Sequence, residues 1–243
     1  MSNSWSYNLL LPSGVRLARE RIIGIITQAQ SIGFMARNPV TGKVSVMSQD
    51  GAESFDYKDL TDATSFLERG GGRIQLWKDA DDIGLLFELR GENSPHNVND
   101  AQNDGDSIAI SVDGTYYRGE DRQRIITADD LQQLFVDLGS VAHAGYGYSW
   151  DEELYDLAYL HGERELFERL YIDVCARQWP STLFWLNYFS RDYAEIVGLD
   201  DMRRLGATIT TVPNGVLATF FDYPWDVDVH NLWEINQRWR QLR

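Results

Sequence analysis

Three potential metal ligands alternate near the end of the chain, Asp226, Asp228 and His230, and Asp222 precedes them. Side chains that alternate along a β-strand share one of its faces, so an extended strand would bring these three together. Carboxylates and an imidazole suit a divalent cation, and one hypothesis is therefore a metal-dependent hydrolase that uses this Asp/His cluster. The alternative is that aspartates beside Pro224 mark an exposed strand end or loop.

A second pair of potential ligands lies earlier in the chain. His161 and Glu165 are four residues apart, as two groups on one face of a helix would be. Gly162 lies between them and is expected to break the helix there. The pair therefore indicates no metal site by itself.

His143 precedes two tyrosines and an aspartate in the stretch AHAGYGYSWD. One interpretation is an acid–base pair formed with Tyr146, Tyr148 or Asp151. The other, which we favour, is that His143 ends a helix near its last carbonyl groups and that an aromatic strand or loop follows.

The common catalytic motifs are absent from the sequence. It contains no G-x-S-x-G elbow, no phosphate-binding loop, no dinucleotide fingerprint and no H-E-x-x-H motif. The single cysteine, Cys175, excludes an intramolecular disulfide and a cysteine-rich zinc site. We therefore expect a protein that is not an enzyme and that carries no cofactor.

Acidic residues instead gather beside large aromatic residues or expected helix starts. Carboxylates next to tryptophan suit recognition of a basic protein surface, although carboxylates at a helix start also stabilise the positive end of its dipole. Asp200 and Asp201 form one such group. The predicted partner-binding residues are Asp151, Glu152, Glu153, Asp222, Trp225, Asp226 and Asp228.

The overall charge agrees with a protein partner. The chain has 37 acidic and 22 basic residues and a formal net charge of -15, which opposes binding to nucleic acid or to an anionic membrane. It favours solubility and fast encounter with a basic protein. No apolar run approaches the roughly 20 residues that cross a bilayer. The first residues lack the pattern of a signal peptide, so we expect a cytoplasmic protein.

Hydrophobic spacing predicts the elements that position these residues. Strands are expected at 5–11, 43–48, 73–79, 83–90, 106–113, 181–190, 207–212 and 216–223. Helices are expected at 15–33, 60–69, 127–142, 152–161, 163–177, 231–243 and, as short pieces, within 191–205. Capping boxes are expected at Thr127 with Asp130 and at Ser149 with Glu152. Residues 91–106 are expected to form a surface loop, and Pro213-Asn214-Gly215 a tight turn.

This pattern indicates an α+β fold, mainly antiparallel sheet with helices packed on it. Two halves, about 1–120 and 121–243, each contain a helix, a glycine and a hairpin, and they resemble each other in pattern at low identity. Because no linker separates them, we expect a single compact domain over 1–243. The stretch from Trp179 to Asp228 is expected to be the framework on which the rest packs.

The second half, from roughly 128 to 228, resembles the bacterial immunity proteins that neutralise polymorphic toxins, in particular the immunity protein 52 family and related uncharacterised families. The similar residues are the helix leading into AHAGYGYSWDE, then LFWLNYFSRDYAEIVGLDDMRRL, the Pro213-Asn214-Gly215 turn and the Pro224-Trp225-Asp226 exit. The resemblance implies a non-enzymatic protein that binds and neutralises a cognate toxin. A protein-binding scaffold module that neutralises nothing is the remaining alternative.

Overall fold

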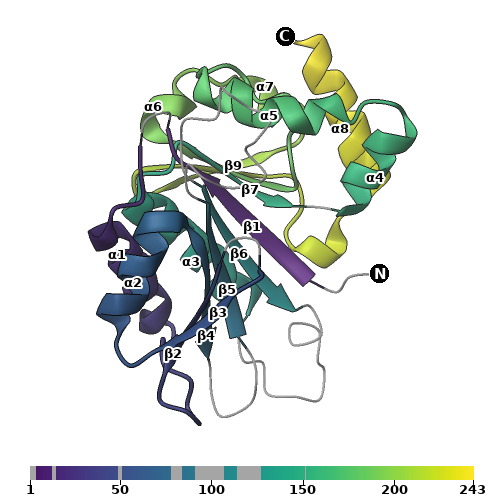
Figure 1. The fold of residues 1–243 in the computed structure, drawn as a ribbon. Coiled ribbons are helices and arrows are strands. Elements are labelled where there is room, and N and C mark those ends of the chain that lie inside the picture. Colours follow the sequence, from purple (N-terminus) through teal and green to yellow (C-terminus); the bar gives the residue numbers. More distant parts are fainter. Residues whose placement is uncertain are drawn as a thin grey trace.

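The computed structural model describes residues 4–12, 15–48, 51–77, 84–90, 107–113, 127–150 and 152–243. In these ranges the strands form one 10-stranded sheet with the order β3-β2-β4-β5-β6-β1-β7-β8-β10-β9 (Figure 1). All strand pairings within the described ranges are antiparallel, and with the packed helices this confirms the α+β class. The strands are β1 (Ser4–Leu10), β2 (Val44–Met47), β3 (Ser54–Tyr57), β4 (Gly72–Trp77), β5 (Gly84–Arg90), β6 (Ser107–Asp113), β7 (Tyr146–Trp150), β8 (Leu186–Ser190), β9 (Thr208–Val212) and β10 (Gly215–Thr219).

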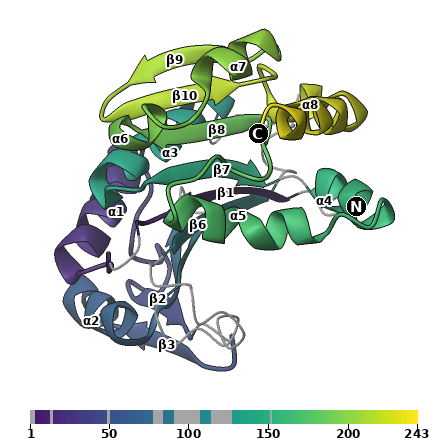
Figure 2. The same cartoon turned by 90° about the horizontal axis from the view of Figure 1, so that it is seen from above.

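The helices lie in two groups, one on each side of this sheet (Figures 1 and 2). The first group is α1 (Arg19–Ser31), α2 (Leu60–Gly70) and α3 (Ala128–Ala142). The second is α4 (Glu152–Leu160), α5 (Glu165–Cys175), α6 (Arg191–Ala194), α7 (Leu199–Arg204), the 3-10 helix η3 (Pro224–Asp226) and α8 (Val229–Gln241). Both helix-plus-hairpin units exist: α2 precedes the β4–β5 pair, and α7 precedes the β9–β10 pair.

The strand at the centre of the sheet comes from the start of the chain. β1 pairs with β6 on one side and with β7 on the other, so that Leu9 is opposite both Ile108 and Gly147. Its neighbours therefore belong to different halves of the sequence. β1 joins the two halves into one sheet, a central role that hydrophobic spacing alone did not assign to it.

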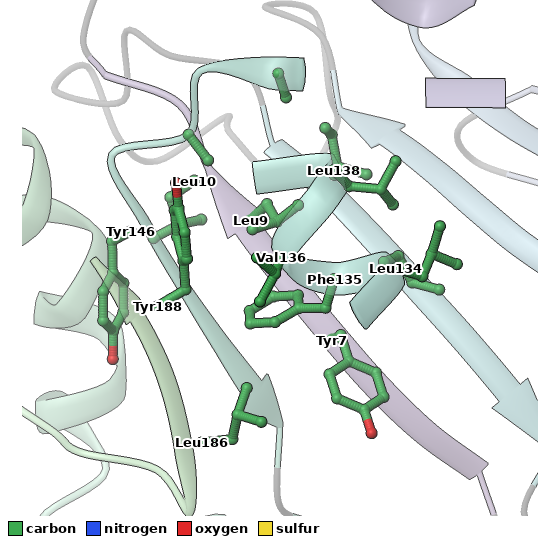
Figure 3. Close-up of a cluster of buried hydrophobic side chains, with 14 of the residues drawn as sticks. Tyr7, Leu9, Leu10, Leu134, Phe135, Val136, Leu138, Tyr146, Leu186 and Tyr188 are labelled. Carbon is green, nitrogen blue, oxygen red and sulfur yellow. The ribbon is translucent and has the colours of Figure 1, made fainter. Parts of the chain in front are cut away.

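One face of the central strands packs against α3. Tyr7 and Leu9 point to this face, and the rings of Tyr7 and Phe135 are 5.5 Å apart (Figure 3). Gly147 lets the helix approach, because a Cβ atom there would lie 2.6 Å from the Phe135 ring. All of these aromatic side chains are buried, so this contact is the middle of the hydrophobic core.

The opposite face carries a second aromatic cluster, which the second group of helices covers. Tyr148 stacks on Phe184 with ring centroids 4.4 Å apart. Trp150 lies 5.4 Å from Tyr155 of α4 and 5.7 Å from Phe167 of α5. Alternation along β7 thus sends its aromatic residues to this side, while Gly147 and Ser149 face α3.

The last helix is attached by tryptophan, as expected for residues 231–243. Trp239 is fully buried, stacks on Trp179 at 4.7 Å, and donates from Nε1 to the carbonyl oxygen of Pro180 at 2.8 Å. Trp179 in turn donates from Nε1 to the carbonyl oxygen of Ile196. These contacts fix α8 against the stretch that begins at Trp179.

Local signals in the sequence had mixed outcomes. The capping box of Thr127 and Asp130 is present at the start of α3. The box predicted at Ser149 is wrong, because β7 continues to Trp150 and the Ser149 hydroxyl accepts from Trp185 Nε1 inside the core. The first helix begins at Arg19 and not at residue 15.

Several expectations fall on residues that the structure does not describe. The predicted loop at 91–106 and the position of Asp151 lie outside the described ranges. Among the residues that are described, no helix combines the length and the apolar character needed to cross a membrane.

Candidate functional site

Six of the seven predicted partner-binding residues are described, and they lie in two places. Glu152 and Glu153 form the exposed first turn of α4, and the remaining residues lie just before α8. Helices α4 and α8 pack against each other (Figure 1). The residues before α8 are Asp222, Trp225, Asp226 and Asp228.

Helix α4 presents an acidic and apolar outer face. Leu154 and Ala158 are buried and define the inner face of the helix. Residues on the opposite face recur every three or four positions and point outwards. These outer residues begin with Glu152, Glu153 and Asp156 and end with Tyr159 and Leu160, which are 62% and 79% exposed. We call Glu152, Glu153, Asp156, Tyr159 and Leu160 the α4 outer face.

Sequence reasoning missed three members of this face. Asp156, Tyr159 and Leu160 were not among the predicted site residues, although the signal was present. Once Leu154 and Ala158 are assigned to the buried stripe, helical spacing places Tyr159 and Leu160 outside it. A single exposed apolar residue is ordinary, but two large ones that neighbour each other on an exposed helix face are more informative.

An aromatic pair flanks the predicted aspartates before α8. The rings of Tyr223 and Trp225 stack at 4.9 Å and are nearly parallel, with an interplanar angle of 9°. Their side chains remain 36% and 41% exposed, and Asp222 and Asp226 adjoin them in the chain. A stacked pair loses little conformational freedom on binding, which suits it to anchor a partner protein.

The helices under this surface are held firmly together. His161, just after α4, stacks on Trp233 at 5.1 Å. Arg240 bonds Glu163 at 2.7 Å and lies over the Trp233 ring at 5.3 Å. Burial lowers the pKa of Arg240 from its ordinary value, and the charge of Glu163 opposes that shift. The two helices therefore offer a preformed surface.

The metal-site hypothesis loses its geometric basis. Asp226 ends η3 and Asp228 precedes α8, so these residues do not alternate along a strand. The Asp228 carboxylate accepts from the backbone N–H groups of His230 and Asn231, at 3.0 and 3.1 Å, and thereby caps α8. Within the described ranges, no group of three or more His, Cys, Asp or Glu side chains is arranged to hold a metal ion.

The structure also bears on the two other histidine hypotheses, except for Asp151, which lies outside the described residues. Gly162 adopts a φ of 71° and separates His161 from α5, as predicted. His143 ends α3, in agreement with the favoured interpretation. Tyr146 does not act with it, because its buried hydroxyl donates to Asn187 Oδ1 at 2.8 Å, and burial raises its pKa well above the ordinary value.

Asp200 and Asp201 do not contribute to the candidate surface. Each forms an ion pair three residues further along α7, with Arg203 at 2.6 Å and Arg204 at 2.8 Å. These are exposed pairs within one short helix, of a kind that contributes little to stability.

Comparison with protein-family models found no match for this chain, and comparison with curated proteins found none either. The resemblance to immunity proteins therefore stays a prediction from the residues that carry it.

Proposed function

We propose that this protein is a stoichiometric inhibitor of the immunity type, which binds a basic bacterial toxin domain through the α4 outer face and the segment 222–228 that precedes α8. The observation that carries the proposal is the combination of three carboxylates with exposed Tyr159 and Leu160 on one helix face. The resemblance and the net charge of -15 support it.

Binding would use two kinds of contact. The carboxylates attract a positively charged partner over long range and orient it, which raises the association rate more than the final affinity. Tyr159, Leu160 and the stacked Tyr223–Trp225 pair then lose water against the partner, and such aromatic contacts supply most of the binding energy at protein interfaces. A toxin that acts on nucleic acid would carry the complementary basic surface. Covering that surface would block its substrate.

The test is growth rescue with the protein encoded by the neighbouring gene. That protein is expressed in a laboratory bacterium with and without this chain, and we expect toxicity that co-expression relieves. A neighbouring product that is not toxic, or that remains toxic when this chain is co-expressed, would contradict the proposal. A complex that forms without rescue would instead favour the scaffold alternative.

Charge reversal locates the surface. We expect the triple variant Glu152→Lys, Glu153→Lys and Asp156→Lys to abolish rescue and to slow association at least tenfold at low salt. The triple variant Glu20→Lys, Glu53→Lys and Asp62→Lys is the matched control, since it changes the net charge equally and its residues are exposed in the first half of the chain, far from α4 in sequence. Equal loss of rescue in both variants would mean that overall charge matters and that the α4 outer face does not.

A further inference from the structure

A cavity of about 410 Å³, lined by polar and apolar groups alike, lies where five segments of the chain meet. They are Pro12 after β1, the end of α3, Arg177 just beyond α5, the end of β8 with the start of α6, and the turn between β9 and β10. Both views place α6 at the opposite end of the molecule from α4 (Figures 1 and 2). The cavity is therefore separate from the α4 outer face, and its volume lies within the range of small-molecule sites.

Three residues of this cavity have an unusual backbone conformation. His143, Arg177 and Asn214 have φ values of 55°, 53° and 60°, and within the described ranges they are the non-glycine residues with positive φ. All three line the same cavity. Left-handed conformation in non-glycine residues costs stability and concentrates at functional sites.

Two of these positions are ones where glycine is normally preferred. Ala144 N–H bonds the carbonyl of Gly139 beyond the end of α3, and Gln178 N–H bonds the carbonyl of Asp173 beyond the end of α5. This pattern places His143 and Arg177 at the left-handed position that closes a helix, which glycine fills with least strain. At both helix ends the chain has a basic side chain there instead.

Two positively charged side chains that line the cavity have no partner among the described residues. The guanidinium groups of Arg177 and Arg191 form no hydrogen bond or ion pair with any described residue. By contrast, Arg203, Arg204 and Arg240 each pair with a carboxylate. In a chain with a net charge of -15, two free arginines in one cavity mark a site for an anion.

Hydrogen bonds fix the walls and leave donors available. Asn214 Nδ2 donates to Ser140 Oγ at 2.5 Å. The backbone carbonyl oxygen of Asn214 accepts from the backbone N–H of Arg191 at 3.0 Å. The Ser190 hydroxyl accepts from the Tyr193 N–H. The Ser140 and Ser190 hydroxyls therefore serve as acceptors within the protein and keep their protons for a ligand. One carboxylate, that of Asp192, also lines the cavity.

We propose that this cavity binds a small phosphorylated polyol, such as a sugar phosphate. Arg177 and Arg191 hold the phosphate group, because guanidinium groups bond its oxygens in pairs. His143 and the serine hydroxyls add further donors. Asp192 would repel a bare anion but accepts hydrogen bonds from ligand hydroxyl groups, and the cavity has room for more than a phosphate ion. The proposal does not depend on the immunity function.

Calorimetric titration tests it with three probes in phosphate-free buffer at constant ionic strength. We expect ribose 5-phosphate to bind with a dissociation constant of roughly 0.1–1 mM. We expect inorganic phosphate to bind about tenfold more weakly and ribose not to bind. Absence of binding by both phosphate probes at a concentration of about 10 mM overturns the proposal. Equal affinity for the two overturns the polyol part.

The Arg177→Gly variant separates binding from folding. Glycine suits the left-handed backbone at this position, so the variant should melt at the same temperature as the native chain or higher. Its affinity for ribose 5-phosphate should nevertheless fall about tenfold. Arg191→Gln should behave likewise in binding, and Arg203→Gln, whose arginine pairs with Asp200, is the matched control. Unchanged affinity in Arg177→Gly would show that the cavity is not the site.

Discussion

Two buried asparagines position the residues that lead into β8. Asn236 of α8 accepts from the Leu183 N–H at 2.7 Å and donates to the Leu183 carbonyl at 2.8 Å, so one side chain satisfies both backbone groups of that residue. Asn187 does the same for Phe184, at 3.1 and 2.7 Å. Both asparagines are almost fully buried. They replace secondary-structure hydrogen bonds in a buried segment that is neither helix nor strand.

Asn236→Ala should therefore destabilise the protein strongly. It leaves the N–H and carbonyl groups of Leu183 buried without partners, which we expect to lower the free energy of unfolding by about 3 kcal/mol. Urea denaturation followed by tryptophan fluorescence measures the change. Asn231→Ala is the control, because Asn231 is exposed on the same helix. A loss below about 1 kcal/mol in Asn236→Ala would show that water replaces the missing bonds.

We expect the buried phenol of Tyr146 to make the protein less stable at alkaline pH. Burial, with smaller contributions from Tyr193 and Tyr148, raises its pKa in the folded protein well above the ordinary 10.0. Below pH 10 the phenol is neutral in both states. Above it the unfolded chain loses the proton first, so the free energy of unfolding falls by up to about 1.4 kcal/mol per pH unit.

Tyr146→Phe removes this group and should make the decline between pH 10 and pH 11 shallower by about 1 kcal/mol. Denaturant titrations at several pH values measure it. The variant also loses the hydroxyl bond to Asn187, which lowers stability at pH 7 by about 1 kcal/mol. Tyr159→Phe, at an exposed tyrosine, is the control. An unchanged slope in Tyr146→Phe would assign the alkaline decline to other groups.

At the scale of elements, signals that depend on neighbouring residues were read correctly and those that depend on distant contacts were not. The capping box at Thr127 and the turn at Asn214 need only local chemistry. The capping box predicted at Ser149 is wrong because the Ser149 hydroxyl accepts a hydrogen bond from Trp185 Nε1 inside the core. The strand face predicted for Asp226, Asp228 and His230 does not exist, because Asp226 ends η3 and Asp228 caps α8. Alternating residues fit a strand or a capped helix start, and sequence spacing does not separate the two.

Gly215→Ala tests how closely β10 packs. A Cβ atom at this position would lie 2.3 Å from the Phe189 carbonyl oxygen of β8, and backbone cannot move aside cheaply. We expect the substitution to lower the free energy of unfolding by about 2–3 kcal/mol, measured by urea denaturation. Gly145→Ala is the matched control, since its Cβ atom would have 3.6 Å to its nearest neighbour. Equal stability of the two variants would contradict the close approach.

At the scale of the whole molecule, the order of strands was beyond sequence reasoning. The α+β class followed from alternating helices and hairpins. The position of β1 did not, because WSYNLLL contains no signal for its two partners, which are about 100 and 140 residues away. The candidate surface shows the same division. Glu152 and Asp226 could be proposed from the sequence as acidic residues near aromatic ones, whereas the cavity lined by Arg177 and Asn214 exists only because distant segments meet.

The central position of β1 predicts that both halves of the chain unfold together. Leu9 is fully buried and lies between strands of both halves. We therefore expect Leu9→Ala to lower the free energy of unfolding of the whole sheet by about 3 kcal/mol. Amide hydrogen exchange measures this separately for β4 in the first half and β10 in the second. If the sheet is one cooperative unit, protection of the slowest amides falls equally in both strands, because they exchange only through global unfolding. If protection falls in one strand alone, the halves are independent units, and the single domain expected over residues 1–243 is wrong.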